Sequence, residues 1–431
     1  MKSIWQTGEI PEFPTLAGDI STDVLIIGGG AAGLLCAYYL RQCGVDCVLV
    51  EKEKICSGVT QNTTAKITAQ HGFVYQKIER AYGLHAARKY YEINQKAIGE
   101  YERLSRQIPC DFTVRDNVVY TTDDGEKAQR EKTVLRMIGC DAEWEDTLPI
   151  PVEIRGAVRV PGQAQFHPLK FFAGLSEGLP IYEHTWVREM IGCTAVTDSG
   201  KIRAKKVIVA THFPFINKHG GYFLKLYQHR SYVLALKGTP DFGGMYVDEN
   251  DGGFSFRNAG DYLLLGGGGA RTGKKCGGWE ELKTVAKSCF PGAETAFAFA
   301  AQDCMSLDVI PYIGPYARGT EGLYVATGFN KWGMTSSMVA AMLLCDAVRG
   351  KRNPYQSVFD PTRSILHPSL AVNGWEAVTG LLSFRRKRCP HLGCALHWNA
   401  AEHTWDCSCH GSRFAADGKV LDNPANGDLP E

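Results

Sequence analysis

The chain of 431 residues is too long for one ordinary hydrophobic core, so we expect at least two domains. Its 44% hydrophobic and 22% charged residues are typical of a globular protein and exclude wholesale disorder or a fibrous repeat. The 47 basic and 46 acidic side chains leave a formal net charge of +1, which gives no indication of binding to nucleic acid or to an anionic membrane.

The N-terminal residues 1–16 lack the apolar stretch and the cleavage site of a signal peptide. The longest uncharged run, residues 24–40, has four glycines near its start, which favours a strand, turn and helix over a transmembrane helix. Of the 15 cysteines, 11 lie scattered between Cys36 and Cys345, as expected for reduced, mostly buried thiols. We therefore expect a soluble, cytoplasmic protein without a transmembrane segment.

A dinucleotide-binding loop is predicted near the N-terminus. Residues 23–27 (DVLII) form a predicted buried strand and lead directly into GGGAAG, which satisfies GxGxxG with Gly28, Gly30 and Gly33. These three glycines allow a tight turn, close approach of a pyrophosphate, and close packing of helix on sheet. A predicted helix and second strand follow, and Glu51 at the end of that strand can accept a hydrogen bond from a ribose hydroxyl. The alternative is a glycine-rich structural turn.

This loop alone does not distinguish NAD from FAD. The other dense glycine cluster, residues 263–273, does not fit GxGxxG, and we interpret it as a strand that ends in a flexible turn. Residues 205–214 give another buried strand. Farther on, the strand 323–327 leads into a glycine-bearing loop, and Thr335 or Ser336 can cap the next helix. Such a helix start would stabilise negative charge on a reduced flavin.

The segments between these motifs are less specific. Residues 76–107 predict two charged, amphipathic helices, and residues 110–122 predict strands with turn-forming residues between them. Residues 227–236 and 254–266 predict strands of an antiparallel sheet. Three prolines indicate that residues 351–388 form an extended connector along the surface.

The C-terminal residues predict a metal centre. The motifs CPHLGC and CSCHGSRF place Cys389 with His391 and, after fifteen intervening residues, Cys407 with His410. Two thiolates and two imidazoles can hold a zinc ion, or a Rieske [2Fe-2S] cluster in which one iron takes the cysteines and the other the histidines. A knot held only by disulfides is the third possibility.

Residues 23–350 resemble the D-amino acid oxidase, glycine oxidase and sarcosine oxidase superfamily of FAD-dependent oxidoreductases. The resemblance implies an α/β module over residues 1–350, with a Rossmann-like FAD-binding domain interleaved with an antiparallel-sheet substrate domain. The implied FAD-binding segments are residues 20–75, 155–215 and 305–350, and the implied substrate-domain segments are residues 76–154 and 216–304. The implied FAD contacts are Gly28, Gly30, Gly33, Glu51, Thr63, Thr64, Ala65, Val187, Gly328, Gly333, Met334 and Thr335. An ordinary capped turn is the alternative for the two threonines.

Residues 389–431 resemble a truncated, small all-β Rieske segment, and the whole chain resembles bacterial oxidoreductases that carry such a segment after the flavin module. The resemblance implies a disulfide between Cys394 and Cys409 and a hydrogen bond from Ser412 to a bridging sulfide. Phe414 stands where the highest-potential Rieske proteins have a tyrosine, so one stabilising donor is missing. Since only 43 residues are present from the first cluster cysteine on, we expect this segment to depend on the flavin module.

The resemblance implies oxidation of a carbon bearing an amine, for which the substrate must be clamped over the flavin. Candidate clamps are Arg257, Tyr232, His71, Lys331 and Trp332, although each also has an ordinary structural interpretation. The segment before Asp308 lacks the arginine with which several amino acid oxidases grip a carboxylate, and this weakens the assignment of a plain α-amino acid.

We therefore expect a flavin enzyme that oxidises a small amine or amino-acid-like substrate by hydride transfer to FAD. Single electrons would then pass through the Rieske cluster to an unidentified acceptor, and the sequence allows the reverse flow equally. One alternative is a redox-sensing or electron-carrier flavoprotein without efficient amine turnover. The other is a flavoenzyme with a structural zinc knot. Nucleic acid is not an expected partner.

Overall fold

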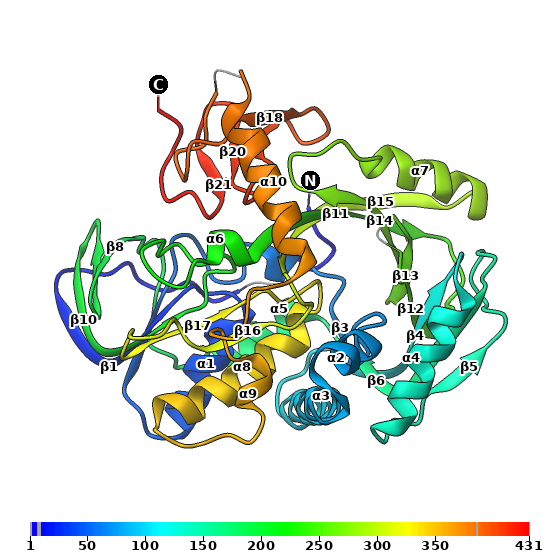
Figure 1. The fold of residues 1–431 in the computed structure, drawn as a ribbon, viewed down its shortest axis with the longest axis horizontal. Coiled ribbons are helices and arrows are strands. Elements are labelled where there is room, and N and C mark those ends of the chain that lie inside the picture. Colours follow the sequence, from blue (N-terminus) through cyan, green and yellow to red (C-terminus); the bar gives the residue numbers. More distant parts are fainter. Residues whose placement is uncertain (1, 7–9, 251, 385–386, 431) are drawn as a thin grey trace.

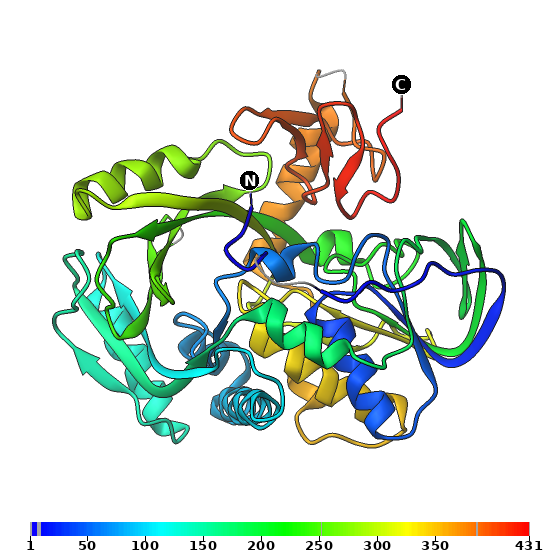
Figure 2. The same cartoon turned by 180° about the vertical axis from the view of Figure 1, so that it is seen from behind.

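The computed structural model describes residues 2–6, 10–250, 252–384 and 387–430, and these residues form three sheets (Figures 1 and 2). The first two sheets lie side by side, each with its own helices. The small third sheet and helix α10 (Pro368–Leu382) lie over the junction between them in both views. The C-terminal segment therefore touches both parts of the larger module.

The first sheet has a parallel core in which β1 lies between β10 and β2, and β10 also pairs with β17. Its central strands are apolar and buried on both faces, and α1 (Ala31–Gln42) and α8 (Gly333–Val348) cover one of these faces. In sheet order the strands are β16 (Tyr312–Pro315), β17 (Leu323–Thr327), β10 (Gly200–Val209), β1 (Ile20–Ile27), β2 (Cys47–Val50) and β7 (Ile181–Tyr182), with β8 (Val187–Ile191) and β9 (Thr194–Thr197) beside β10. The predicted Rossmann-like arrangement is confirmed.

The second sheet is mainly antiparallel, apart from the parallel pair β12 and β4. Its strands are β15 (Glu294–Ser306), β11 (Leu226–Lys237), β14 (Tyr262–Arg271), β13 (Ser255–Ala259), β12 (Gly244–Asp248), β4 (Thr113–Thr121), β6 (Gly156–Gln165) and β3 (Lys66–Ile67), with β5 (Glu143–Glu145) beside β6. Strands β3 and β6 belong to this sheet although they fall within the segments expected to bind FAD. The turn expected inside residues 110–122 is wrong, because β4 runs through it with only a register shift against β6.

The glycine cluster at residues 263–273 is also not the expected flexible turn, because β14 runs through it. A Cβ at Gly266 would lie 2.6 Å from Ser255 Oγ, and one at Gly269 would collide with the main-chain oxygen of Arg230. The glycines therefore let neighbouring strands approach closely.

The helices fall where the periodicity predicts them in the first half of the chain. Residues 76–107 form the two expected helices, and Gly83 separates them with a φ of 82°. The helices of the large module are α1 (Ala31–Gln42), the short η1 (Val59–Asn62), α2 (Tyr75–Tyr82), α3 (Leu84–Ser105), α4 (Gly125–Met137), α5 (Pro168–Ser176), α6 (Tyr222–Lys225), α7 (Gly278–Cys289) and α8 (Gly333–Val348).

The expected extended connector over residues 351–388 is wrong. It contains α9 (Gln356–Phe359) and the 15-residue α10 (Pro368–Leu382), in which the proline occupies the first turn, where it needs no hydrogen-bond partner. The small third sheet then follows with β18 (Leu396–Asn399), β19 (Thr404–Cys407), β20 (Arg413–Ala415) and β21 (Val420–Asp422). Among the described residues, every helix is too short or too polar to cross a bilayer.

Candidate functional site

The glycine loop between β1 and α1 lines one end of a large cavity. Gly28 has a φ of 111°, and a Cβ there would lie 2.6 Å from the main-chain oxygen of Ala210. A Cβ at Gly33 would collide with the main-chain oxygen of Gly28, so this glycine allows α1 to pack against the loop. The first turn of α1 has no acidic side chain, and Gly30 at its N-cap has no side chain that could cap the helix. The helix start can therefore accept a phosphate.

Glu51 is fixed beside this loop. Its carboxylate accepts hydrogen bonds from the main-chain N–H groups of Gly29 at 2.7 Å and Glu53 at 3.0 Å. Burial raises the pKa of this carboxyl, while these two donors oppose the shift. The side chain lines the cavity, as the predicted ribose contact requires.

The polar loop at Thr63 and Thr64 is held from two distant parts of the chain. The indole of Trp5 donates to the main-chain oxygen of Thr63 at 2.7 Å, and the Arg257 guanidinium donates to that of Thr64. Both threonines line the cavity, whereas Ala65, with a φ of 52°, turns the chain behind it. Nothing in the sequence linked Trp5 to this loop, because the contact spans 58 positions.

The start of α8 forms another wall. The helix begins at Gly333, after Trp332 at its N-cap. Capping by Thr335 or Ser336 is therefore wrong: both lie inside the helix, and Thr335 Oγ1 instead bonds the main-chain N–H and oxygen of Thr68 at 3.1 and 2.9 Å. Gly333 and Met334 line the cavity with this uncapped helix start.

Two further residues of the predicted FAD set, Val187 and Gly328, lie outside the glycine loop, the polar loop and the start of α8. Val187 begins β8 and lines the cavity at the end near the C-terminal segment. Gly328 lies outside the lining, where its φ of 72° allows the turn after β17. The cavity that joins the lining members of the set has a volume of about 800 Å³, within the range of cofactor and ligand sites.

The predicted substrate clamps separate into two groups. Tyr232, His71, Lys331 and Trp332 line the cavity. Arg257 does not: its guanidinium donates to Gln165 Oε1 and to the main-chain oxygens of Thr64 and Phe166. The structure therefore gives Arg257 a supporting position behind the polar loop.

His71 is a fixed, neutral part of the wall. Its Nε2 donates to the main-chain oxygen of Thr68 at 2.7 Å, so Nδ1 accepts from the Tyr90 hydroxyl, also at 2.7 Å. Burial lowers the pKa of this imidazole to about 3. The ring stacks on Trp332 with centroids 5.1 Å apart. This pair offers a flat surface rather than a base.

The cavity also contains charged side chains that the sequence did not single out. Lys66 is buried beside Thr64 Oγ1, 3.3 Å away, and burial together with Arg257 lowers its pKa to about 7. Asp303 on β15 lines the cavity as well, and none of the ion pairs among the described residues includes it. Neither residue belongs to a motif of the sequence, so the position of a charged side chain in the cavity wall is what marks each as a candidate.

The second candidate centre lies in the C-terminal segment, where two loops bring together Cys389, His391, Cys407 and His410. The two imidazoles lie 5.0 Å apart, between centroids. In both rings Nδ1 is buried and has no hydrogen-bond partner among the described residues. Burial lowers the pKa of His391 to about 4 and that of His410 to about 3, so both rings are neutral, as metal ligands must be.

The surroundings of the two sulfurs fit a cluster of iron and sulfide. The main-chain N–H groups of His391 and Leu392 and the Ser412 hydroxyl point to the Cys389 sulfur. The N–H groups of Cys409 and His410 point to the Cys407 sulfur. The two sulfurs contact each other, and the two neighbouring imidazoles each keep an unpaired Nδ1, so the set of donor atoms is the one that a Rieske cluster requires.

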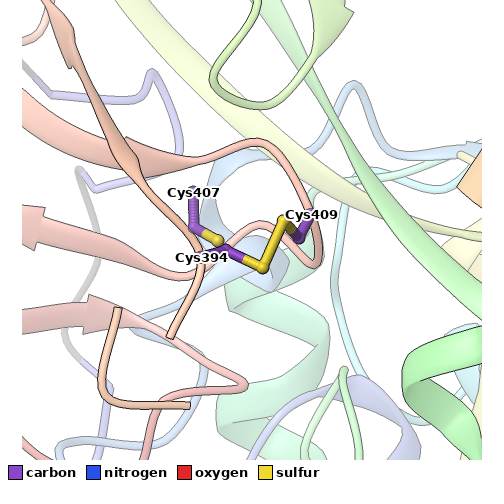
Figure 3. Close-up of side chains that lie close together, drawn as sticks. All are labelled: Cys394, Cys407 and Cys409. Atoms are coloured by element: carbon purple, nitrogen blue, oxygen red, sulfur yellow. A yellow bond between two sulfur atoms is a disulfide. The ribbon is translucent and has the colours of Figure 1, made fainter. Parts of the chain in front are cut away.

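A disulfide joins Cys394 to Cys409, with Cα atoms 6.6 Å apart, and so ties the two loops together (Figure 3). Cys407 lies next to this bond, and the three sulfurs form a compact group. They cannot together ligate a metal, because two of them are bonded to each other. The free thiol of Cys407 is available to the neighbouring centre.

The outer edge of the histidine pair is covered by the flavin module. His391 Nε2 lies 3.0 Å from Asn217 Oδ1, and the His410 ring bonds the main chain of Phe223. The Phe213 ring lies 6.4 Å from each imidazole, between centroids. The histidine side of the centre therefore faces the large module.

Gln228 at the start of β11 connects the candidate cluster centre of the C-terminal segment to the cavity of the flavin module. Its Nε2 donates to the main-chain oxygens of His410 at 3.2 Å and Asn423 at 2.7 Å, while its Oε1 lies 3.1 Å from His212 Nε2. Both His212 and Asn423 line the cavity. One buried side chain thus contacts both candidate centres.

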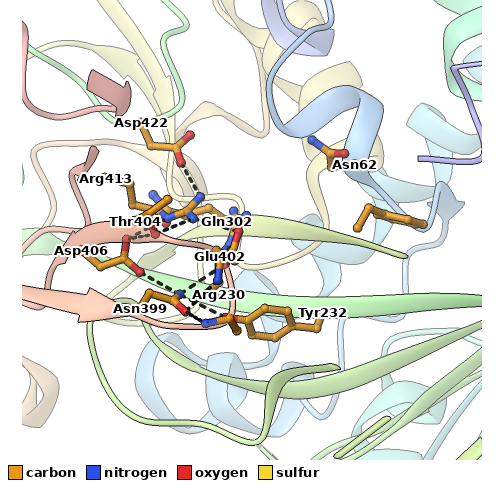
Figure 4. Close-up of polar contacts among 12 residues, drawn as sticks. Asn62, Arg230, Tyr232, Gln302, Asn399, Glu402, Thr404, Asp406, Arg413 and Asp422 are labelled. Carbon is orange, nitrogen blue, oxygen red and sulfur yellow. Dashed lines mark hydrogen bonds and ion pairs between the residues drawn. The ribbon is translucent and has the colours of Figure 1, made fainter. Parts of the chain in front are cut away.

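Arginine side chains form further contacts between the C-terminal segment and the flavin module. Arg271 donates to the main-chain oxygens of Ser408 at 2.9 Å and Cys409 at 2.8 Å. Arg413 lies among three carboxylates, and one of these, Glu402, also binds Arg230 of β11 at 2.5 Å (Figure 4). The expectation that the short segment depends on the flavin module agrees with these contacts.

Fold and sites thus define a flavoprotein oxidoreductase with an attached iron–sulfur segment, and the comparisons with known proteins agree. The family described as "FAD dependent oxidoreductase" matches residues 23–347, and the "Rieske [2Fe-2S] domain" matches residues 375–431. The chain belongs to the FAD-dependent oxidoreductase family of the D-amino acid oxidase type and carries a C-terminal Rieske domain. Its cofactors are FAD and a [2Fe-2S] cluster.

Individual relatives cover both parts. The Bacillus subtilis protein YhfW, named as a Rieske 2Fe-2S iron-sulfur protein, is 35% identical over 98% of this chain and 96% of its own length. Gamma-glutamylputrescine oxidoreductase of Escherichia coli is 24% identical over 78% of this chain and 86% of its own. Glycine oxidase from Geobacillus kaustophilus shares the fold with a TM-score of 0.68 and 21% identity, over 80% of this chain and 99% of that one.

Proposed function

We propose that the protein oxidises a small amine or amino-acid-like substrate by hydride transfer to FAD and exchanges single electrons between FAD and the Rieske cluster. When bound, FAD takes up an electron pair as a hydride, whereas the cluster carries one electron at a time. The observation that carries the proposal is the position of Gln228, which contacts a cluster-loop residue and a residue of the flavin cavity.

The predicted ligands fit this division of tasks. Cys389 and Cys407 would hold one iron through their sulfurs, and His391 and His410 the other through Nδ1. In the cavity, the glycine loop would bind the pyrophosphate, and the helix start at Gly333 would face the negatively charged part of a reduced flavin. The protein thus holds both groups without needing a second nucleotide site.

The cavity wall favours an amine as substrate. His71 and Trp332 present a flat stacked surface, and Asp303 offers a carboxylate that can pair with an ammonium group. The names of the relatives, glycine oxidase and gamma-glutamylputrescine oxidoreductase, indicate amine substrates for those proteins. Chemistry of this kind requires a clamped substrate more than a strong base.

An anaerobic stopped-flow experiment on the full chain tests the relay. Mixing with a panel of small amines should bleach the flavin absorbance first and the Rieske absorbance afterwards. The relay would be wrong if the cluster signal never changed after flavin bleaching. Slow bleaching with every amine, together with a fast response to a protein electron donor, would instead indicate an electron carrier.

The cluster ligands are tested separately by metal analysis. Cys389→Ser and His410→Gln should lower the iron content strongly and leave the FAD content unchanged. Cys276→Ser, which changes a half-buried thiol outside the cluster loops, serves as the control. Unchanged iron in the first two variants would contradict the ligand assignment.

A further inference from the structure

The C-terminal segment forms part of the wall of the large cavity. We call residues 420–426, which begin in β21, the C-terminal wall. Its lining members are Val420, Leu421, Asp422, Asn423, Ala425 and Asn426. The FAD contacts implied by the sequence all lie between Gly28 and Thr335. This part of the cavity is therefore still without a role.

Asn426 fixes the C-terminal wall to the start of β8. Its Oδ1 accepts a hydrogen bond from the Trp186 indole at 2.6 Å, and its Nδ2 donates to the main-chain oxygen of Arg188 at 2.9 Å. The central carbon of the Arg188 guanidinium lies over the Trp186 ring, 3.5 Å from the centroid. Trp186 also lines the cavity, so this indole and the asparagine that holds it belong to the same surface.

These contacts lie at the end of the cavity where Glu51 is fixed. The main-chain N–H of Thr185, the neighbour of Trp186, donates to the main-chain oxygen of Glu51 at 2.8 Å. Lys52 Nζ donates to the main-chain oxygen of Leu421 at 3.4 Å and lies 5.4 Å from the Trp186 ring centroid. The C-terminal wall therefore lies beside the carboxylate that is the candidate contact for the ribose of FAD.

Asn423 makes a second attachment, to the loop that supports the glycine turn. Its Nδ2 donates to the main-chain oxygens of Thr211 and Phe213, the latter at 2.7 Å. This loop packs directly on Gly28, where a Cβ would lie 3.2 Å from the main-chain nitrogen of Thr211. Asn423 and Asn426 thus hold the C-terminal wall against two separate parts of the candidate nucleotide site.

The two asparagines do more than attach the segment. A side chain that served attachment alone would be covered by the flavin module on every side. Asn423 and Asn426 are instead only half-buried, and both line the cavity. Their amide groups therefore fix the wall while part of each residue faces the space that a ligand would fill.

We propose that the C-terminal wall is part of the FAD site and retains the nucleotide half of the cofactor. Asn426 acts as a positioning residue through Trp186, and Asn423 acts through the loop beside Gly28. The wall slows the release of FAD, because it covers cofactor surface that would otherwise face solvent. The inference rests on the placement of FAD proposed above, with its ribose at Glu51, and it is independent of the substrate and of the electron relay.

Release of FAD from the full-length holoprotein tests the proposal. After dilution, the rise in flavin fluorescence gives the rate of release, and iron is measured in the same sample. Asn426→Ala and Asn423→Ala should each speed release about tenfold, because hydrogen bonds that fix the wall are lost, while the iron content stays constant. The matched control is Asn353→Ala, which removes a half-buried asparagine that bonds Asp346 at 2.8 Å outside the cavity.

A double-mutant cycle separates positioning from a general loss of stability. If Asn426 acts through Trp186, Trp186→Phe should speed release by a similar factor, and the combination with Asn426→Ala should release FAD little faster than either single variant. Factors that multiply, as they do for independent sites, would overturn the positioning role. Because Trp186 belongs to the flavin module, its variant also keeps the test valid if an asparagine variant loses iron.

Glu51→Ala distinguishes this inference from the placement of FAD on which it rests. If Glu51→Ala speeds release and the two asparagine variants release FAD at the rate of the unaltered protein, the C-terminal wall has no part in the site and the inference alone is overturned. If Glu51→Ala also leaves the rate unchanged, the placement of the ribose is overturned together with the inference. Circular dichroism should show that all variants fold.

Discussion

Gln228 donates a hydrogen bond from Nε2 to the main-chain oxygen of His410, 3.2 Å away, and so joins the second sheet to a cluster loop. The same amide nitrogen bonds the main-chain oxygen of Asn423, and its oxygen faces His212 in the cavity wall. The amide is almost completely buried.

Gln228→Leu should therefore weaken the junction. Two buried carbonyl oxygens lose their donor, which costs about 1–3 kcal/mol for each unsatisfied group. We expect an earlier unfolding transition of the cluster segment in a denaturant titration and slower exchange of electrons between flavin and cluster in stopped-flow. Gln129→Leu, on the exposed side of α4, is the control. Equal rates in both variants would show that the amide contributes nothing to the relay.

Arg257 should behave as a supporting residue rather than as a substrate clamp. Its guanidinium is buried and holds the Thr64 loop through a main-chain oxygen. Arg257→Gln should lower the affinity for FAD and the free energy of unfolding by about 2–4 kcal/mol, since buried acceptors remain unpaired. Once saturated with FAD, the variant should keep the KM of the unaltered enzyme. A large rise in KM at full FAD occupancy would return Arg257 to the list of clamps.

Asp303 predicts a specific pH dependence. Burial raises the pKa of this carboxyl to about 6, although Lys331 and Arg230 act in the opposite direction. Above this pH the carboxylate is charged and can pair with an ammonium group, and below it the attraction is lost. For a cationic amine, kcat/KM should therefore fall as the pH drops through about 6. This fall of kcat/KM at acidic pH, the acidic limb of the profile, should be absent in Asp303→Asn. At neutral pH the variant should have a kcat/KM lowered about 10- to 100-fold.

The control for this experiment is a neutral substrate analogue, for which Asp303→Asn should change kcat/KM little. If the acidic limb persists in the variant, another group carries it. Lys66 is the next candidate, because its pKa of about 7 lies nearby.

The parts of the site that could be predicted from the sequence are those whose residues lie close together along the chain. The glycine loop with Glu51, and the four cluster residues, were recognisable because each motif is local and its chemistry is restrictive. Trp5 could not be found, and Arg257 was named only as a candidate clamp, because both residues act on the loop of Thr63 and Thr64 from distant positions. The junction at Gln228 was also invisible, since one glutamine in a strand carries no signal of its partner.

The same distinction explains the errors in the fold. Residues 351–388 contain prolines that suggested an extended chain, yet Pro368 begins a helix. The glycines of β14 suggested a flexible turn, yet they serve close packing against Arg230 and Ser255. In both places a local residue type was compatible with two structures, and the packing partner decided between them.

The disulfide between Cys394 and Cys409 should stabilise the Rieske segment, because it closes a loop between positions 15 residues apart. A loop of this length corresponds to about 3 kcal/mol in the chain-entropy treatment. Cys394→Ala combined with Cys409→Ala should therefore lower the stability of the segment by about that amount and speed the loss of iron on warming, while FAD content stays constant. The control is Cys43→Ala, which removes an exposed thiol outside the segment. If iron loss were equally slow in both variants, the contacts of Arg271 and Gln228 would be sufficient to hold the cluster loops in place.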